Sequence, residues 1–234
     1  MIAPFRHPSL IIGAAFSLVL VAAALLSWIW TPHSPFEMNL EHRLLPPGAP
    51  YWLGTDPFGR DVLSLLLVGA RNSILVGVIA VGIGLIVGTA LGLVASARRG
   101  WTEEVIMRLS DFTFAFPAIL SAIMMTAVFG PGIVNSIIAI GIFNIPTFAR
   151  ITRGSANALW AREFVLAARA CGKGPTSITV EHILPNIIPI LIVQATIQFA
   201  IAILAEAALS YLGLGTQPPQ PSWGRMLSDA QTLL

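Results

Sequence analysis

Long apolar stretches alternate with shorter polar segments along the chain. Five of these stretches carry few or no charged residues, and each is long enough to cross the roughly 30 Å hydrocarbon core of a bilayer as a helix. They comprise residues 9–30, 74–97, 101–129, 133–149 and 187–212. The pattern predicts an all-α polytopic membrane protein with five complete spans.

Composition and charge agree with this prediction. Hydrophobic residues make up 56% of the chain and charged residues only 10%, whereas about a quarter of the residues in soluble domains are charged. Nine of the 13 basic residues, including Arg6, lie on one side of the predicted membrane, and basic loops favour the cytoplasmic side. The N-terminus is therefore expected in the cytoplasm, and the basic balance implies no nucleic-acid partner. The first apolar stretch is longer than the roughly 7–15 apolar residues of a cleaved signal peptide.

The segment between the first two spans, residues 31–73, is expected outside the cell membrane. Asp56 and Gly59 predict a turn, and Asp61 predicts the cap of a short amphipathic helix that lies along the membrane interface before the second span. The same segment contains His33, Glu37, Glu41 and His42. Their spacing matches no set of metal ligands, so the sequence predicts no metal site.

Within the spans, three features predict how helices pack or bend. Gly84, Gly88 and Gly92 recur at every fourth position and predict a face on which another helix packs closely. Arg108 and Asp111 are one turn apart near the cytoplasmic surface, where an ion pair within the helix is expected. Pro117 is expected to kink the third span.

Polar residues inside the fifth span are candidates for a translocation path. They are Gln194, Gln198 and Glu206, which follow a four-residue row along the helix. A carboxylate at membrane depth is costly and is by default a functional candidate. A structural hydrogen bond to a neighbouring helix would explain the presence of Glu206 equally well.

A long polar insertion, residues 150–186, separates the last two spans. It carries five basic residues against two acidic ones, which places it in the cytoplasm. The composition of residues 155–171 predicts a helix, and Gly172, Gly174 and Pro175 predict a break after it. Pro175 suits the first position of a second helix, which is expected to be short because Pro185 follows ten residues later.

This insertion resembles the EAA signature of membrane subunits of ATP-binding cassette importers, which reads Glu-Ala-Ala, three residues, Gly, nine residues and Ile-x-Leu-Pro. The matching positions are Ala167, Ala168, Gly172, Leu184 and Pro185. Leu166 stands where the pattern has Glu, and His182 stands where it has Ile; whether Glu163 replaces the missing carboxylate is open. The sequences AARAxG, HILPN, GTDPFGRD and SWG are similar to the dipeptide, oligopeptide and nickel permease branch.

The resemblance implies a type I importer permease fold with one further C-terminal span beyond Leu234. It implies an N-terminal span and periplasmic segment over residues 1–69 and a permease core over residues 70–234. By this resemblance, the insertion is a coupling elbow that docks on an ATPase subunit. Its expected residues are Glu163, Ala167, Ala168, Arg169, Gly172, Leu184 and Pro185.

The implied function is that of a translocation subunit in the bacterial plasma (inner) membrane, importing peptides or nickel. Its implied partners are a homologous second permease, two cytoplasmic ATPases, an extracytoplasmic substrate-binding protein and the lipid bilayer. No catalytic residue or cofactor is expected in this chain. The sole lysine, Lys173, precedes Gly174, whereas a Walker A loop needs Lys followed by Ser or Thr; ATP and Mg²⁺ are expected on the partner ATPases.

An ion-coupled secondary transporter is the alternative function. In that mechanism Glu206 would be the coupling carboxylate and the glutamines would line the site. Inverted internal repeats would favour this alternative, and the sequence contains no convincing repeat. The residues do not distinguish a peptide cargo from a nickel cargo.

Overall fold

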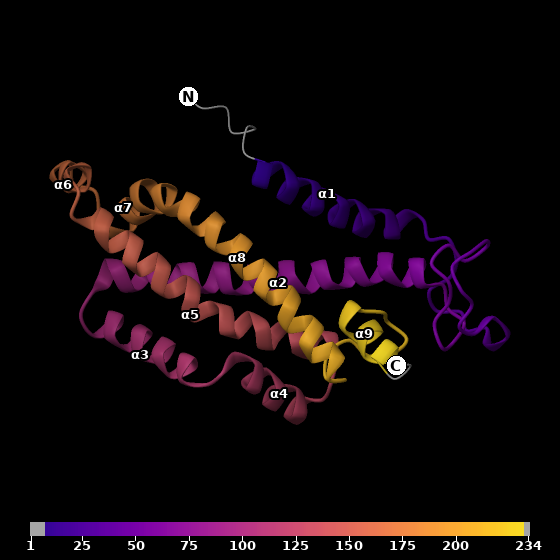
Figure 1. Cartoon of the computed structure of the whole chain (residues 1–234). Coiled ribbons are helices and arrows are strands. Elements are labelled where there is room, and N and C mark those ends of the chain that lie inside the picture. Colours follow the sequence, from indigo (N-terminus) through magenta and orange to yellow (C-terminus); the bar gives the residue numbers. More distant parts are fainter. Residues whose placement is uncertain (1–7, 232–234) are drawn as a thin grey trace. The chain divides into compact units, whose positions relative to one another are not determined.

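The computed structural model describes residues 8–231, so Arg6 and His7 lie outside the described residues. Within that range the regular structure is helical, with a single isolated bridge between Thr55 and Asp61. In chain order the elements are α1 (Pro8–Ile29), η2 (Leu40–His42), α2 (Val62–Arg98), α3 (Trp101–Ala115), α4 (Ala118–Phe129), α5 (Ile133–Trp160), α6 (Glu163–Ala170), α7 (Pro175–Ile178), η3 (Thr179–Ile183), α8 (Leu184–Tyr211) and α9 (Trp223–Gln231) (Figure 1).

Among residues 8–231, four helices are long and apolar enough to cross a membrane. They are α1, α2, α5 and the continuous helix from Pro175 to Tyr211, and the bent pair α3 and α4 raises the number to five if it counts as one span. Only 6% of α1 is buried inside the protein, as expected for a helix that is apolar on all sides and faces lipid. The all-α polytopic class is thereby confirmed.

The chain forms two compact units. One comprises Met1–Leu75, Pro131–Ile133 and Ala207–Leu234, and the other comprises Val76–Gly130 and Val134–Glu206.

In the first unit, the start of α2 differs from the prediction. Asp61 caps the helix as expected, since its Oδ2 accepts a hydrogen bond of 2.9 Å from the backbone N–H of Ser64. The separate interfacial helix is wrong, however, because α2 continues without a break to Arg98. The C-terminal segment supports this extension: Trp223 Nε1 donates to the carbonyl of Leu66 at 3.1 Å, and Asn72 Nδ2 donates to that of Pro221 at 2.8 Å.

In the second unit, Pro117 ends a helix instead of kinking it. α3 stops at Ala115, and α4 begins at Ala118 with a bend of 84° between them. Phe116 is extended, with φ −100° and ψ 133°, which is the conformation that a following proline favours. The expected kink is therefore a break.

The expected ion pair between Arg108 and Asp111 is also wrong. Arg108 bonds to Glu104, one turn earlier on α3, with a distance of 2.7 Å between Nη2 and Oε1. Asp111 pairs instead with Arg150 on α5. Spacing along one helix could not identify the partner of Asp111, because Arg150 lies on another helix.

Three glycines of α2 lie directly against α5. A Cβ atom built on Gly84 would lie 2.3 Å from Asn144 Cβ, one on Gly88 would lie 2.4 Å from the carbonyl oxygen of Ile145, and one on Gly92 would lie 2.5 Å from that of Ala149. Real Cβ atoms do not approach so closely. The two helices therefore pack backbone to backbone along about two turns.

This contact predicts opposite effects for the same substitution at two positions of α2. Gly88→Ala should lower the free energy of unfolding of the purified protein by about 1–3 kcal/mol, and with it the melting temperature, because the new methyl group collides with the backbone of α5. Gly82→Ala is the control, since nothing lies within 4 Å of its Cβ position and alanine favours a helix over glycine by about 1 kcal/mol. Equal stability of the two variants in a detergent melting assay would contradict the close contact.

Candidate functional site

The candidate elbow begins inside α5 and not after it. α5 continues to Trp160, which is well beyond the end expected for the fourth span at residue 149. The single helix expected over residues 155–171 is wrong, because the chain breaks at Ala161 and Arg162 and α6 begins at Glu163. Both residues at the break are good helix formers. Tertiary packing, which propensity does not include, therefore sets this boundary.

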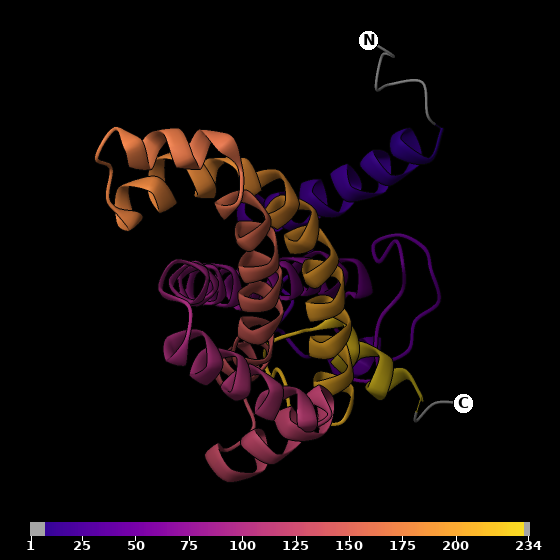
Figure 2. The same cartoon turned by 90° about the vertical axis from the view of Figure 1, so that its left-hand side faces the viewer.

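An apolar cluster folds α6 and the start of α7–η3 back onto the end of α5. Its buried members are Ala156, Trp160, Val165, Ala168, Ile178 and Ile183. Figure 2 shows α6 and the first turns of the α7–α8 helix together at the end of α5. Trp160 also donates its indole N–H to Ser96 Oγ at 3.3 Å, and the Arg169 guanidinium lies 5.2 Å from the Trp160 ring centroid. The elbow is thus a folded structure with its own small core.

Gly172 makes the turn after α6. Its φ is +84°, a region that side chains disfavour and glycine readily adopts. The N–H of Lys173 donates to the carbonyl of Ala168 at 3.1 Å, and the N–H of Gly172 donates to that of Arg169 at 2.9 Å. This pair of bonds is a Schellman motif, which satisfies the last carbonyls of the helix. The turn expected at Gly172 is confirmed.

Beyond the turn, Pro175 occupies the start of α7 as expected. The prediction that Pro185 ends this second helix is wrong, because α7, η3 and α8 form one continuous helix of 37 residues. η3 is a π-helical segment in which the N–H of Leu184 donates to the carbonyl of Thr179. A π-helical turn opens the hydrogen-bond ladder, so the missing N–H and the ring of Pro185 are accommodated in the next turn.

Polar contacts surround the elbow but contribute less than its core. Lys173 Nζ donates to Glu181, and Ser177 Oγ donates to the same carboxylate at 2.7 Å. The Lys173 and Glu181 side chains are 37% and 50% exposed, and such an exposed pair contributes only about 0–1 kcal/mol. Burial of one Val or Ile side chain contributes about 1.5–3 kcal/mol. The apolar cluster therefore holds the elbow together.

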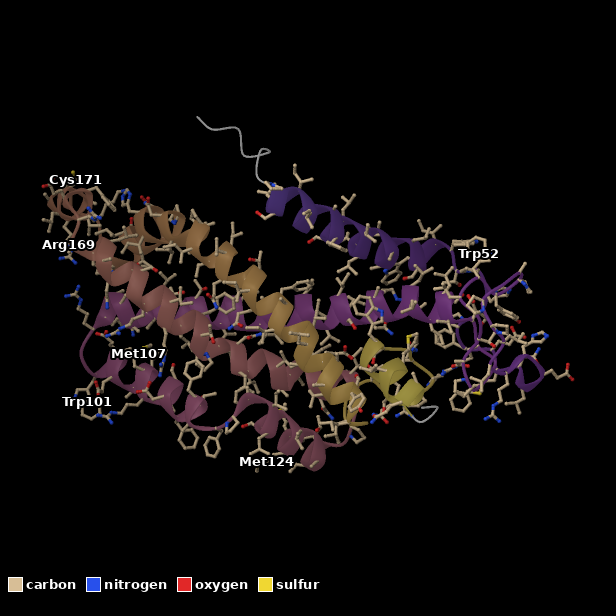
Figure 3. The ribbon with its side chains drawn as sticks, in the orientation of Figure 1. Trp52, Trp101, Met107, Met124, Arg169 and Cys171 are labelled. Atoms are coloured by element: carbon tan, nitrogen blue, oxygen red, sulfur yellow. The ribbon has the colours of Figure 1, made fainter. Side chains whose placement is uncertain are left out.

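α6 also presents exposed side chains, some of them apolar, on both sides of its buried residues Val165 and Ala168. Phe164 is 42% exposed and Leu166 is 54% exposed. Glu163, Ala167 and Arg169 are exposed on the same short helix. Arg169 and Cys171, labelled in Figure 3, lie at the tip of the elbow. Together, the exposed side chains of α6 form its exposed face, which is the part of the elbow that is free to meet another protein.

The structure separates the expected elbow residues into two groups. Ala168 belongs to the buried cluster, whereas Ala167 and Pro185 are exposed and Leu184 is half-buried. Sequence reasoning missed most of the cluster, above all Trp160, Val165, Ile178 and Ile183. The four-residue spacing of Ala156 and Trp160 was a detectable signal, because it places both side chains on one face of a helix. The residues that pack against this face come later in the chain, after the break at Ala161 and after the turn at Gly172.

The candidate residues on α8 are buried to different extents. Gln194 is half-buried, Gln198 is 7% exposed and Glu206 is 1% exposed. Their expected place on a translocation path stays a prediction. Among the described residues, no group of three or more His, Cys, Asp or Glu side chains is arranged to hold a metal ion.

Comparison with known proteins places this geometry in a family. The model of the family "Binding-protein-dependent transport system inner membrane component" matches residues 80–234. The chain is 45% identical over 225 residues to the dipeptide transport system permease protein DppC of Alkalihalophilus pseudofirmus, covering 96% of this chain and 73% of the relative. It is 38% identical to the glutathione transport system permease protein GsiD of Pectobacterium atrosepticum, covering 97% of this chain and 76% of that protein.

A solved structure shows the same fold. A chain of the MetNI methionine ABC transporter in an inward-facing conformation superposes with a TM-score of 0.58 at 20% sequence identity, covering 65% of this chain and 76% of the other. The fold is therefore that of a type I importer permease. The family match and the 45% identity show that the chain belongs to the binding-protein-dependent transport system inner membrane components, the permease subunits of ATP-binding cassette importers.

Proposed function

We propose that this permease carries small peptides across the bacterial inner membrane and that residues 150–186 couple its movement to partner ATPases. The observation that carries the coupling role is the elbow itself: a small folded structure on the end of α5 with an exposed, partly apolar face. The relatives described above are named for dipeptide and glutathione transport, which supports a peptide cargo and gives no support to nickel.

The proposed complex contains this chain, a second permease, two ATPases that bind ATP and Mg²⁺, and an external binding protein. In this arrangement the N-terminus and the elbow both lie on the cytoplasmic side of the membrane, where the ATPases are. Residues 1–69 are an N-terminal span with a periplasmic segment, added to a permease core over residues 70–234. The family match, which begins at residue 80, supports this division.

Each elbow residue has a proposed role. Ala168 anchors α6 in the cluster and Gly172 sets the turn, whereas Leu184 and Pro185 lie where the helix that begins at Pro175 continues from η3 into α8. Glu163, Ala167 and Arg169 contact the ATPase together with the apolar side chains of the same face. Family membership favours this ATP-driven mechanism over an ion-coupled one in which Glu206 binds the coupling ion; Gln194, Gln198 and Glu206 are instead proposed to line the path of the cargo.

Purification of the intact complex in mild detergent, followed by mass spectrometry and uptake measurements in vesicles, tests this function. We expect a second permease and two ATPases to co-purify, and we expect labelled dialanine or glutathione to enter the vesicles only with ATP and the binding protein. Uptake that follows an ion gradient without ATP would contradict the proposal.

The exposed face of α6 should control ATPase binding. Replacing both Phe164 and Leu166 by serine should weaken the binding free energy for the ATPases by about 2 kcal/mol or more, because apolar side chains at the centre of an interface contribute most of its binding energy. The loss should be visible as less ATPase co-purifying with the permease. Trp101→Ser is the control, since Trp101 is 86% exposed and lies outside the elbow. Unchanged ATPase binding by the double variant would contradict this role of the face.

We expect coupling to depend on the backbone conformation at Gly172 and not on the room available for a side chain there. Gly172→Ala should reduce the cargo transported per ATP, because a side chain at positive φ costs about 1–2 kcal/mol. Gly174→Ala should behave like the native protein, since Gly174 has φ −76° and neither glycine has a neighbour within 4 Å of its Cβ position. Equal coupling in the two variants, measured at equal abundance in the membrane, would contradict the role of the turn.

A further inference from the structure

α3 is poorly held by apolar packing. Ser110 is its one buried residue, while Leu109 and Phe112 are 63% and 66% exposed. A polar hollow of about 570 Å³ borders its first half, next to Met107 (labelled in Figure 3). A second hollow of about 150 Å³ with a mainly apolar lining lies beneath Leu109. Both hollows are open at the surface, and α3 contributes only Ser110 to the buried residues.

Two ion pairs bridge from α5 to α3 instead. Arg153 contacts Glu103 through both Nε and Nη2, each 2.5 Å from Oε1. Arg150 pairs with Asp111, and its guanidinium lies 4.6 Å from the ring centroid of Phe114. All four charged residues line the polar hollow. The two bridges therefore set how far apart the helices stand.

The arginines belong to the helix that carries the elbow. Arg153 precedes Trp160 by about two helical turns, and Trp160 is packed into the elbow cluster. Between them the helix has no break. A displacement of Trp160 is thus transmitted to both guanidinium groups along one unbroken helix.

The far end of α3 is free to bend. The chain is extended at Phe116, and the next helix runs at 84° to α3. A short extended connection between two helices can absorb changes in backbone angle, as hinges do. α3 is therefore joined to α5 by side-chain bridges and to α4 through the extended residue Phe116.

We propose that the pairs Arg153–Glu103 and Arg150–Asp111 are struts through which α5 moves α3 when the ATPase displaces the elbow, so that the hollow between the two helices opens and closes with the ATPase cycle. The four charged residues are positioning residues for transport. This inference rests on the coupling role proposed for residues 150–186.

Charge reversal in the assembled complex tests the struts. Arg153→Glu and Glu103→Arg should each lower the cargo transported per ATP by about fivefold or more, the lower end of typical coupling between distant sites. ATPase co-purification should not change, because Arg153 and Glu103 lie outside α6 and outside the buried cluster. Combining the two substitutions restores an ion pair of opposite polarity and should restore coupling. The melting temperature should be native in both single variants and in the combined one, whereas a purely structural defect would lower it in the single variants.

The pair Arg108–Glu104 provides the matched control. It lies within α3, with a distance of 2.7 Å, and its reversal changes the same charges without affecting a bridge to α5. We expect native coupling in Arg108→Glu and Glu104→Arg.

Each outcome decides between the proposals. Three results would overturn the struts: native coupling in the Arg153 and Glu103 variants, failure of the combined variant to recover, or equal losses in the Arg108–Glu104 control. In each of these cases, native uptake by the unmodified complex would still uphold the transport function. If the unmodified complex transports neither dialanine nor glutathione with ATP, the proposed function fails and the struts fail with it.

Discussion

The backbone contact between α2 and α5 is the constraint on which the rest of the second unit depends. Gly84, Gly88 and Gly92 bring the two helices so close that a single methyl group would not fit. The contact also extends to both sides of Pro146, which lies inside α5 and removes one of its hydrogen bonds. Asn144 and Ile145 touch the glycines before the proline, and Ala149 touches them after it. α2 therefore supports α5 at the point where the helix would otherwise bend most easily.

An unbroken α5 connects the elbow to the rest of the second unit. The helix ends at Trp160, and the buried cluster fixes α6 to that end by apolar packing, which contributes more free energy than the exposed ion pairs around it. The two interactions have different consequences. The cluster makes the elbow follow α5 as one body, whereas the bridges from Arg150 and Arg153 reach a helix that has little core of its own. Movement would thus pass from a well-packed part of the chain to a loosely packed one.

Much of this organisation could be read from local sequence, and the remainder depended on contacts between distant residues. Hydropathy predicted the membrane helices, Asp61 predicted the start of α2, and Gly172 predicted the turn after α6, because each signal lies within a few residues of its effect. The break at Ala161 and Arg162 had no local signal. The break lets Val165 and Trp160 enter the same buried cluster, and helix propensity does not report such packing. The partner of Asp111 was missed for the same reason, since Arg150 is 39 residues away in sequence.

The central claim is that α5 and the elbow move together, and a distance measurement between two spin labels tests it most directly. One label can be placed on Cys171, the only cysteine of the chain and exposed at the tip of the elbow, and the other on Val134→Cys, an exposed position at the start of α5. In the assembled complex, the distance should stay constant to within about 2 Å between the nucleotide-free and ATP-trapped states, as expected for a rigid body. A larger change would show that the elbow swings on its own at Ala161 and Arg162 or that α5 bends at Pro146, and either result would contradict the account.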